Sequence, residues 1–153
     1  MKNPAKSNIY SDAKAADLAP YAHAIEGDMD APACIVGFGA LPDEVSSALF
    51  AACGRIGMPD PNVVDASLFQ GSGEAFAAIE GLDPAVLIVA DEVAAALLSE
   101  AYRAPVELDA SGRLFGRPYA AFASFQADLS KASLKQRDWA LLKTLKRSVR
   151  SLR

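Results

Sequence analysis

Short apolar runs alternate along this chain with longer segments whose apolar residues recur every three or four positions. The short runs predict buried β-strands at residues 34–36, 62–66 and 86–89. The longer segments predict helices over 42–55, 74–80 and 91–100, and a last long helix that begins at Ser133. Because strands and helices alternate, we expect an α/β fold with three layers, αβα, and a mostly parallel central sheet.

Two regions complete the expected organisation. Residues 106–109 and 113–115 flank Ala110-Ser111-Gly112, which predicts a hairpin turn, and residues 119–125 predict a further strand. Residues 1–31 form a leader of Ala, Asp and short polar residues that ends in a linker-like stretch from Gly27 to Pro32. The expected domains are therefore the leader, 1–31, and a single α/β domain, 32–153.

Composition limits the class of protein. The chain has 153 residues, 52% of them apolar, which suffices for one domain with a full core. No apolar run reaches the ~18–20 residues of a membrane span, and the first residues lack the apolar segment of a signal peptide. The only cysteines, Cys34 and Cys53, are expected to be buried free thiols. We therefore expect a cytoplasmic protein.

Charge is unevenly distributed. The chain has net charge −4, but residues 131–153 carry eight Lys or Arg and one acid. Leucines and valine on one face of the last helix predict packing against the sheet. A second face of this helix is basic and contains one aromatic residue, Trp139. It comprises Lys135, Lys143, Lys146, Arg150 and Arg153. Such a face can bind the phosphates of DNA, dock on an acidic protein surface, or simply be solvated.

The stretch 34-CIVGFGALPDEV-45 raises the question of a nucleotide site. Gly37-Phe38-Gly39 follows a strand, as in dinucleotide-binding loops, and Asp65 ends the next strand, where a ribose-binding acid would lie. However, Pro42 stands in place of the third glycine. Asp43 and Glu44 add negative charge where a pyrophosphate would bind. A glycine turn that lets the helix pack is the preferred interpretation, and no cofactor is expected.

The sequence contains few residues that could support other kinds of catalysis. The only histidine, His23, lies in the leader, which excludes Ser–His and Cys–His catalysis and a zinc or iron–sulfur centre in the domain. Asp91 and Glu92 follow the third strand and are either helix-capping residues or part of a site. Arg113 and Arg117 are expected near the same edge, as phosphate contacts or as solvated loop charges.

From Pro84 onward the order of elements resembles the uracil-DNA glycosylases of the iron–sulfur kind. The resemblance rests on 84-PAVLIVADEVAAALL-98 and on 118-PYAAFASFQADLSKASLKQRDWALLKTL-145, which includes the Leu134-Lys135…Trp139 element. It covers about residues 33–146 and implies the uracil-DNA glycosylase-like fold. It also implies that two loops, Gly37-Phe38-Gly39 and Ser124-Phe125-Gln126, occupy the positions of the family's active-site loops.

The sequence departs from this family at the catalytic positions. Phe38 stands where the family has an acidic or amide side chain that positions water. Gln126 ends the segment that matches the family's His-Pro-Ser loop. The four cluster cysteines are absent as well. Since each lost group typically costs about 10²–10⁴-fold in rate, we expect a vestigial pocket with no catalytic residue and no metal.

A second resemblance concerns the psi subunit family of bacterial DNA polymerase III clamp loaders. That family has a catalytically empty version of this fold and an N-terminal tail that binds the clamp-loader core. The leader is similar in length and placement, and its Leu18, Tyr21 and Ile25 recur at helical spacing. The resemblances imply a binding or assembly protein in DNA replication or repair, with DNA and a protein as partners. The alternative is a degenerate glycosylase that retains some activity.

Overall fold

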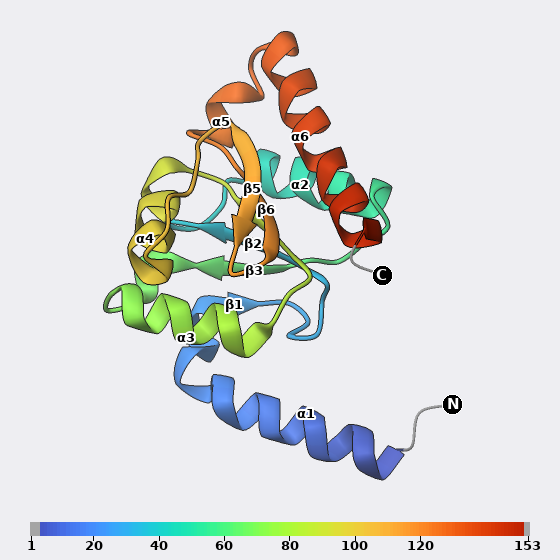
Figure 1. Ribbon diagram of the computed structural model, residues 1–153, viewed down its shortest axis with the longest axis vertical. Coiled ribbons are helices and arrows are strands. Elements are labelled where there is room, and N and C mark those ends of the chain that lie inside the picture. Colours follow the sequence, from blue (N-terminus) through green and yellow to red (C-terminus); the bar gives the residue numbers. More distant parts are fainter. Residues whose placement is uncertain (1–3, 152–153) are drawn as a thin grey trace.

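The computed structural model describes residues 4–151 as backbone, with the side chains of residues 9–149. Helices and strands alternate over most of this range (Figure 1). The helices are α1 (Pro4–Leu18), α2 (Asp43–Arg55), α3 (Ser72–Leu82), α4 (Glu92–Tyr102), α5 (Phe125–Asp128) and α6 (Ala132–Ser151), with 3-10 turns η1 (Ala19–Ala24) and η2 (Ala66–Leu68). The strands are β1 (Ile25–Glu26), β2 (Ala33–Gly37), β3 (Asn62–Asp65), β4 (Val86–Val89), β5 (Ala110–Leu114) and β6 (Arg117–Ala121).

The six strands form one sheet in the order β1-β3-β2-β4-β6-β5. The four central strands are parallel, while β1 pairs antiparallel with β3 and β5 pairs antiparallel with β6. The expected α/β class with a mostly parallel sheet is confirmed. The carboxyl ends of β2, β3, β4 and β6 consequently lie along one edge of the sheet, and their amino ends lie along the other.

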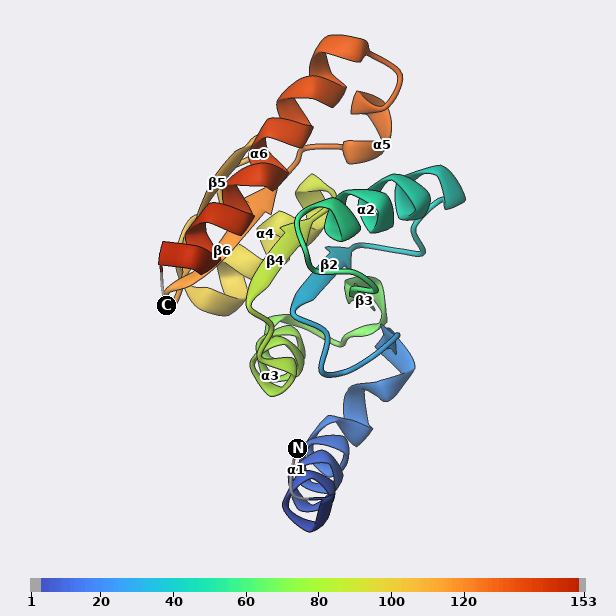
Figure 2. The same cartoon turned by 90° about the vertical axis from the view of Figure 1, so that its right-hand side faces the viewer.

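Helices cover both faces of this sheet (Figures 1 and 2). Because side chains alternate along a strand, Cys34 and Val36 enter one apolar core, with α3, α4 and Leu18. Ile35 enters the other core, with α2, α5 and α6. Every residue of β2 and β4 is buried, which explains why these strands are continuous apolar runs.

The two thiols lie on opposite sides of the sheet, since Cys34 belongs to the first core and Cys53 to the second. Both are free and buried, as expected. Burial raises the pKa of Cys34 to about 12 and that of Cys53 to about 11, so neither is a nucleophile near neutral pH. No helix within residues 4–151 has the length and apolarity needed to cross a membrane.

The predicted hairpin turn was wrong. Ala110, Ser111 and Gly112 lie inside β5, and the turn is instead at Phe115-Gly116, with φ of 50° and 81°. A side chain at Gly112 would approach the Tyr119 hydroxyl to 2.8 Å. Gly112 therefore makes room for a tyrosine on the neighbouring strand. In the sequence, a glycine of this kind looks the same as a glycine in a turn.

Part of the expected leader, residues 1–31, belongs to the core and to the sheet. Leu18 is fully buried and lies against Gly81 of α3, where an added Cβ would come within 2.8 Å of it. Ile25 and Glu26 form β1 and pair with β3, so the sheet extends across the expected boundary at residue 32. The sequence predicts that Gly81 closes the helix over 74–80. The helix instead continues to Leu82, because Asp83 caps it in a left-handed conformation, with φ of 47°.

Candidate functional site

Three loops meet at the carboxyl edge of the sheet, after β2, β4 and β6. Between them lies a cleft of about 400 Å³. Phe38 and Gln126 line it, and Phe38 is 48% exposed. This volume lies within the range of about 300–1,000 Å³ that is typical of small-molecule sites. The structure thus brings the two predicted loops together around an open cavity.

Two carboxylates hold the first loop in place. The Phe38 N–H donates to Asp91 Oδ2 at 2.9 Å, and the Gly39 N–H donates to Asp65 Oδ1 at 2.8 Å. Gly39 has φ of 105°, a backbone conformation that glycine adopts at little cost. Asp65, which the sequence suggested as a ribose ligand, is thus engaged with the loop backbone.

Asp91 also caps α4. Its Oδ1 accepts a hydrogen bond from the Ala94 N–H at 2.8 Å, which confirms the predicted capping role. Both Asp91 oxygens therefore bond to backbone N–H groups, one on α4 and one on the loop of Phe38. Asp91 therefore joins these two segments, and each of its oxygens already accepts a hydrogen bond. The neighbouring Glu92 is exposed on the rim of the cleft.

The second loop is rigid for a similar reason. The Ser124 Oγ accepts from the Ala127 N–H at 3.1 Å and caps α5. Phe125 is buried, with its ring centroid 5.2 Å from that of Phe122, so it does not fill the cleft. Gly37 is likewise buried, whereas Ser124 and Gln126 line the cavity. Of the six predicted pocket residues, four therefore line it: Phe38, Gly39, Ser124 and Gln126.

The chemistry available in this cleft is limited. Its lining contains an exposed aromatic ring, an amide, a hydroxyl and the carboxylates of Asp91 and Glu92. It contains no His, Cys, Lys or Arg. Such a set can stack against a planar ligand through Phe38 and hydrogen-bond it through Gln126. It offers no cation to stabilise an anionic leaving group.

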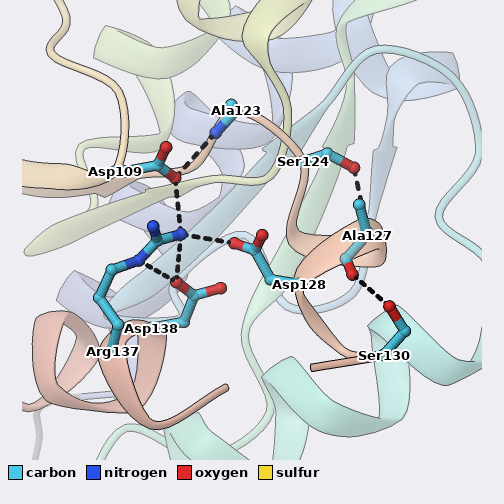
Figure 3. A network of polar contacts seen from close by, with 8 residues as sticks. All are labelled: Asp109, Ala123, Ser124, Ala127, Asp128, Ser130, Arg137 and Asp138. Carbon is cyan, nitrogen blue, oxygen red and sulfur yellow. Dashed lines mark hydrogen bonds and ion pairs between the residues drawn. The ribbon is translucent and has the colours of Figure 1, made fainter. Parts of the chain in front are cut away.

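Beside the second loop lies a buried polar cluster that the sequence analysis missed (Figure 3). Arg137 of α6 bonds three carboxylates. Its Nη2 donates to Asp109 at 3.0 Å and to Asp128 at 2.9 Å, and its Nε donates to Asp138 at 3.1 Å. Asp109 also accepts from the Ala123 N–H at 3.3 Å, at the start of the second loop. The sequence did hold one signal, because Asp138 lies on the same helix face as the apolar Leu142 and Leu145.

Asp138 is the unusual member of this cluster. It is 2% exposed, and its Oδ2 has no hydrogen-bond partner. Burial, and then the neighbouring Asp128, raise the pKa of Asp138 to about 7, against the lowering effect of Arg137. The three carboxylates lie within 4.8 Å of one another, a spacing that suits a metal ion. The Arg137 guanidinium, however, already provides the positive charge among them.

The described lysines of the predicted basic face of α6 lie at the surface, and a residue of α2 joins them. Lys135 and Lys143 are exposed, Lys146 is half-buried, and Trp139 lies at the border with α2. The side chain of Arg150 and all of Arg153 lie outside the described residues. Arg55 of α2 joins this face, a contribution that no local sequence pattern indicated.

The two predicted phosphate contacts in the hairpin do not join the cleft. Arg113 and Arg117 flank the β5–β6 turn, at the amino edge of the sheet, opposite the cleft. Arg117 forms ion pairs with Glu80 at 2.5 Å and Asp83 at 2.9 Å, and its side chain is only 11% exposed. The expected position near the cleft edge is therefore wrong for both arginines, and the Arg117 guanidinium is engaged within the chain. Arg113 is exposed and donates to the Gly116 carbonyl at 2.9 Å.

The expected partner-binding residues of the leader mostly contact the domain itself. Leu18 is fully buried, so it presents no surface. Tyr21 packs edge-on against Phe69, with ring centroids 6.2 Å apart, and Ile25 lies in β1. Among the described side chains of this region, the large exposed ones are instead Ile9 and Tyr10 of α1, which are 67% and 64% exposed.

Comparison of the sequence with known protein families and with curated proteins gives no match. The geometry of the cleft and of the basic face, together with the resemblances noted in the sequence, therefore carries the proposals that follow.

Proposed function

We propose that this chain is a binding or assembly protein of DNA replication or repair, built on a uracil-DNA glycosylase-like fold without base-excision chemistry. One observation carries this proposal. At the carboxyl edge, Phe38 and Gln126 face an open cleft that lacks any cationic or imidazole side chain. The cleft is therefore suited to holding a planar group and not to cleaving a glycosidic bond.

The acids beside the cleft support the same conclusion. Base excision needs a group that orients water and a donor that stabilises the departing base anion. Asp91 and Asp65 instead hold the Phe38 loop through its backbone N–H groups. Their carboxylates therefore fix the position of a loop that lines the cleft.

DNA is the proposed partner of the basic face on α6. Lys135, Lys143 and Lys146 lie along one side of this helix, on a chain whose overall charge is −4. Binding driven by these lysines would be sequence-independent and would weaken as salt rises.

Two assays on the full chain test this function. Uracil release from single-stranded and duplex DNA should stay at background. DNA affinity, followed by fluorescence anisotropy, should fall with rising salt and fall further in a Lys135→Glu/Lys143→Glu variant. Arg103→Glu is the matched control, because Arg103 is an exposed cation at the end of α4 on the other face of the sheet. Absence of DNA binding at low salt would contradict the proposal.

A second candidate is a base-recognising enzyme with residual activity. The volume of the cleft, about 400 Å³, favours it, since the buried Phe125 is not among the residues that line this cavity. Uracil release above background that Gln126→Ala abolishes, with unchanged thermal stability, would establish this second function in place of the first.

We also propose that the leader binds a protein partner through the outer part of α1. Ile9 is exposed there, while Leu18 anchors the end of the helix to the core. Removal of residues 1–13 leaves Leu18 in place and should abolish capture of replication or repair proteins from a lysate. An unchanged set of captured proteins would exclude the leader as a docking segment.

A further inference from the structure

A second hollow lies on the face of the sheet covered by α2 and α6. It has a volume of about 270 Å³, below the range of about 300–1,000 Å³ that is typical of pockets for drug-sized ligands. Its wall from α2 is made of small residues, Ala48, Ala51 and Ala52, which leave room beside Leu142. The hollow is thus a shallow apolar recess of a size that suits one planar group.

Cations surround the recess. Arg55 and Lys135 line it, and Trp139 forms part of its wall. The guanidinium carbon of Arg55 lies 5.6 Å from the Trp139 ring centroid, and the Lys143 ammonium lies 5.5 Å from it. Among the side chains of residues 9–149, no carboxylate forms an ion pair with these three cations.

The chain is acidic outside residues 131–153, yet its own acids leave these cations unneutralised. Among the described residues, the only acid that lines the recess is Asp138, which is 2% exposed and accepts a hydrogen bond from Arg137 Nε. Two cations line this apolar recess, and a third, Lys143, lies beside its aromatic wall. The recess therefore complements a ligand that is planar, aromatic and anionic.

We propose that this recess binds single-stranded DNA, with one base in the recess against Trp139 and the adjoining phosphates on Arg55, Lys135 and Lys143. This inference rests on the proposed DNA-binding function and specifies the form of the DNA and the site. A duplex cannot place a base in the recess without unstacking it, so it gains only the phosphate contacts. An unpaired strand gains both.

The observations favour a nucleic acid over an acidic peptide. Carboxylates alone would use the cations and leave the recess and the Trp139 ring empty. Alternating phosphates and bases use both features at once, as in other single-strand binding surfaces. An acidic peptide is therefore the competitor against which the proposal is tested.

Trp139 is the only tryptophan of the chain, so its fluorescence reports directly on the recess. We expect an oligothymidylate to change the Trp139 emission on binding, and a duplex of equal length to bind more weakly with a smaller change. Trp139→Leu, which keeps an apolar side chain, should weaken single-strand binding about 5- to 100-fold. Trp139→Phe should restore part of it.

The lysines provide an independent measurement. Lys135→Glu and Lys143→Glu should each lower affinity for all sequences and reduce the slope of log affinity against log salt by about 1. Arg103→Glu should change neither value. Thermal melts of each variant show that the fold is intact.

The possible outcomes separate the two proposals. If neither DNA form binds, the proposed function fails together with this inference. If DNA binds but the duplex binds equally well, or Trp139→Leu has no effect, the inference alone fails. Displacement of the oligonucleotide by polyglutamate at equal charge concentration and ionic strength would show a general anion surface, and it would overturn the single-strand assignment as well.

Discussion

Two arginines fasten opposite edges of the same sheet, and they do so in different ways. Arg117 starts β6 at the amino edge and reaches α3 and the residues after it. Arg137 comes from α6 and gathers acids at the carboxyl edge, beside the cleft (Figure 3). Both residues make several ion pairs, so the difference between them lies in the balance of charge and in what remains unpaired.

The Arg117 network has two carboxylates for one guanidinium, so its charge is closer to balance. Its guanidinium meets Glu80 and Asp83, and its Nε donates to the Pro84 carbonyl at 2.7 Å. The Tyr102 hydroxyl donates to Glu80 at 2.7 Å. Burial and the hydrogen bond to Glu80 both raise the pKa of Tyr102, which keeps this hydroxyl protonated as a donor. Among the described residues, no buried side-chain nitrogen or oxygen of this network lacks a hydrogen-bond partner.

The Arg137 network carries an excess of negative charge. Three carboxylates share one guanidinium, and the buried Asp138 Oδ2 has no bonded partner. A proton on Asp138 that is donated toward Asp128 would reduce the excess negative charge and give Asp138 Oδ2 a hydrogen-bond partner. We infer that Asp138 holds this proton at the edge beside the cleft, whereas the buried groups of the Arg117 network at the opposite edge all have partners among the described residues.

The largest effect is expected from Arg117→Met. It leaves Glu80 partly buried without its cation and removes the donor to the Pro84 carbonyl. We expect a loss of about 3–5 kcal/mol in the free energy of unfolding, measured by urea titration. Arg113→Met in the same hairpin is the control and should change stability by less than about 0.5 kcal/mol. Equal losses from the two variants would show that Arg117 is not the structural fastener.

Arg137→Met should have a smaller effect that depends on pH. The Arg137 side chain is 37% exposed, so water partly replaces its bonds. We expect a loss of about 1–3 kcal/mol at pH 8, where three carboxylates would remain without a cation. At pH 5 the loss should be smaller, because Asp138 then keeps its proton and bonds Asp128. A loss that does not vary between these pH values would contradict the shared proton.

The local sequence predicted the secondary structure at these edges. The strand at 34–36 and the cap at Asp91 follow from apolar runs and from a polar residue before a helix, and the structure confirms both. The sequence also pointed to the first cleft loop, since Gly37-Phe38-Gly39 ends a strand, whereas the loop at Ser124-Phe125-Gln126 was implied only by the resemblance. These features depend on neighbours within a few positions.

The arginine networks depend on contacts between distant segments. Arg117 meets Glu80, which lies 37 positions away, and Arg137 meets Asp109 from 28 positions away. Nothing near Arg117 in the sequence distinguishes it from the exposed Arg113. The same limit explains the errors at Gly81 and Gly112, which give space to Leu18 and to Tyr119 and do not mark turns.

Asp138→Asn tests the stored proton directly. The folded pKa of Asp138, about 7, is above its unfolded value, so the folded state holds the extra proton between about pH 4 and pH 7. The stability that this carboxyl contributes is complete below pH 4 and is lost as pH rises through 7. An asparagine keeps the acceptor for Arg137 and places an N–H where Oδ2 was. The variant should therefore be more stable than the wild type at pH 8 and nearly equal to it at pH 5. Parallel stability curves across this range would argue that Asp138 is ionised throughout.

The smallest effect is expected from Tyr102→Phe, at the balanced edge. The change removes the hydroxyl that donates to Glu80, but Glu80 keeps its bond to Arg117 and the ring keeps its packing against Phe76, with centroids 5.0 Å apart. The loss should be about 0.5–1.5 kcal/mol by urea unfolding, the usual value of one hydrogen bond, and the same at pH 5 and pH 8. A pH-dependent loss here would mean that the amino edge also holds a proton that titrates near neutrality, and the contrast between the two arginine networks would then disappear.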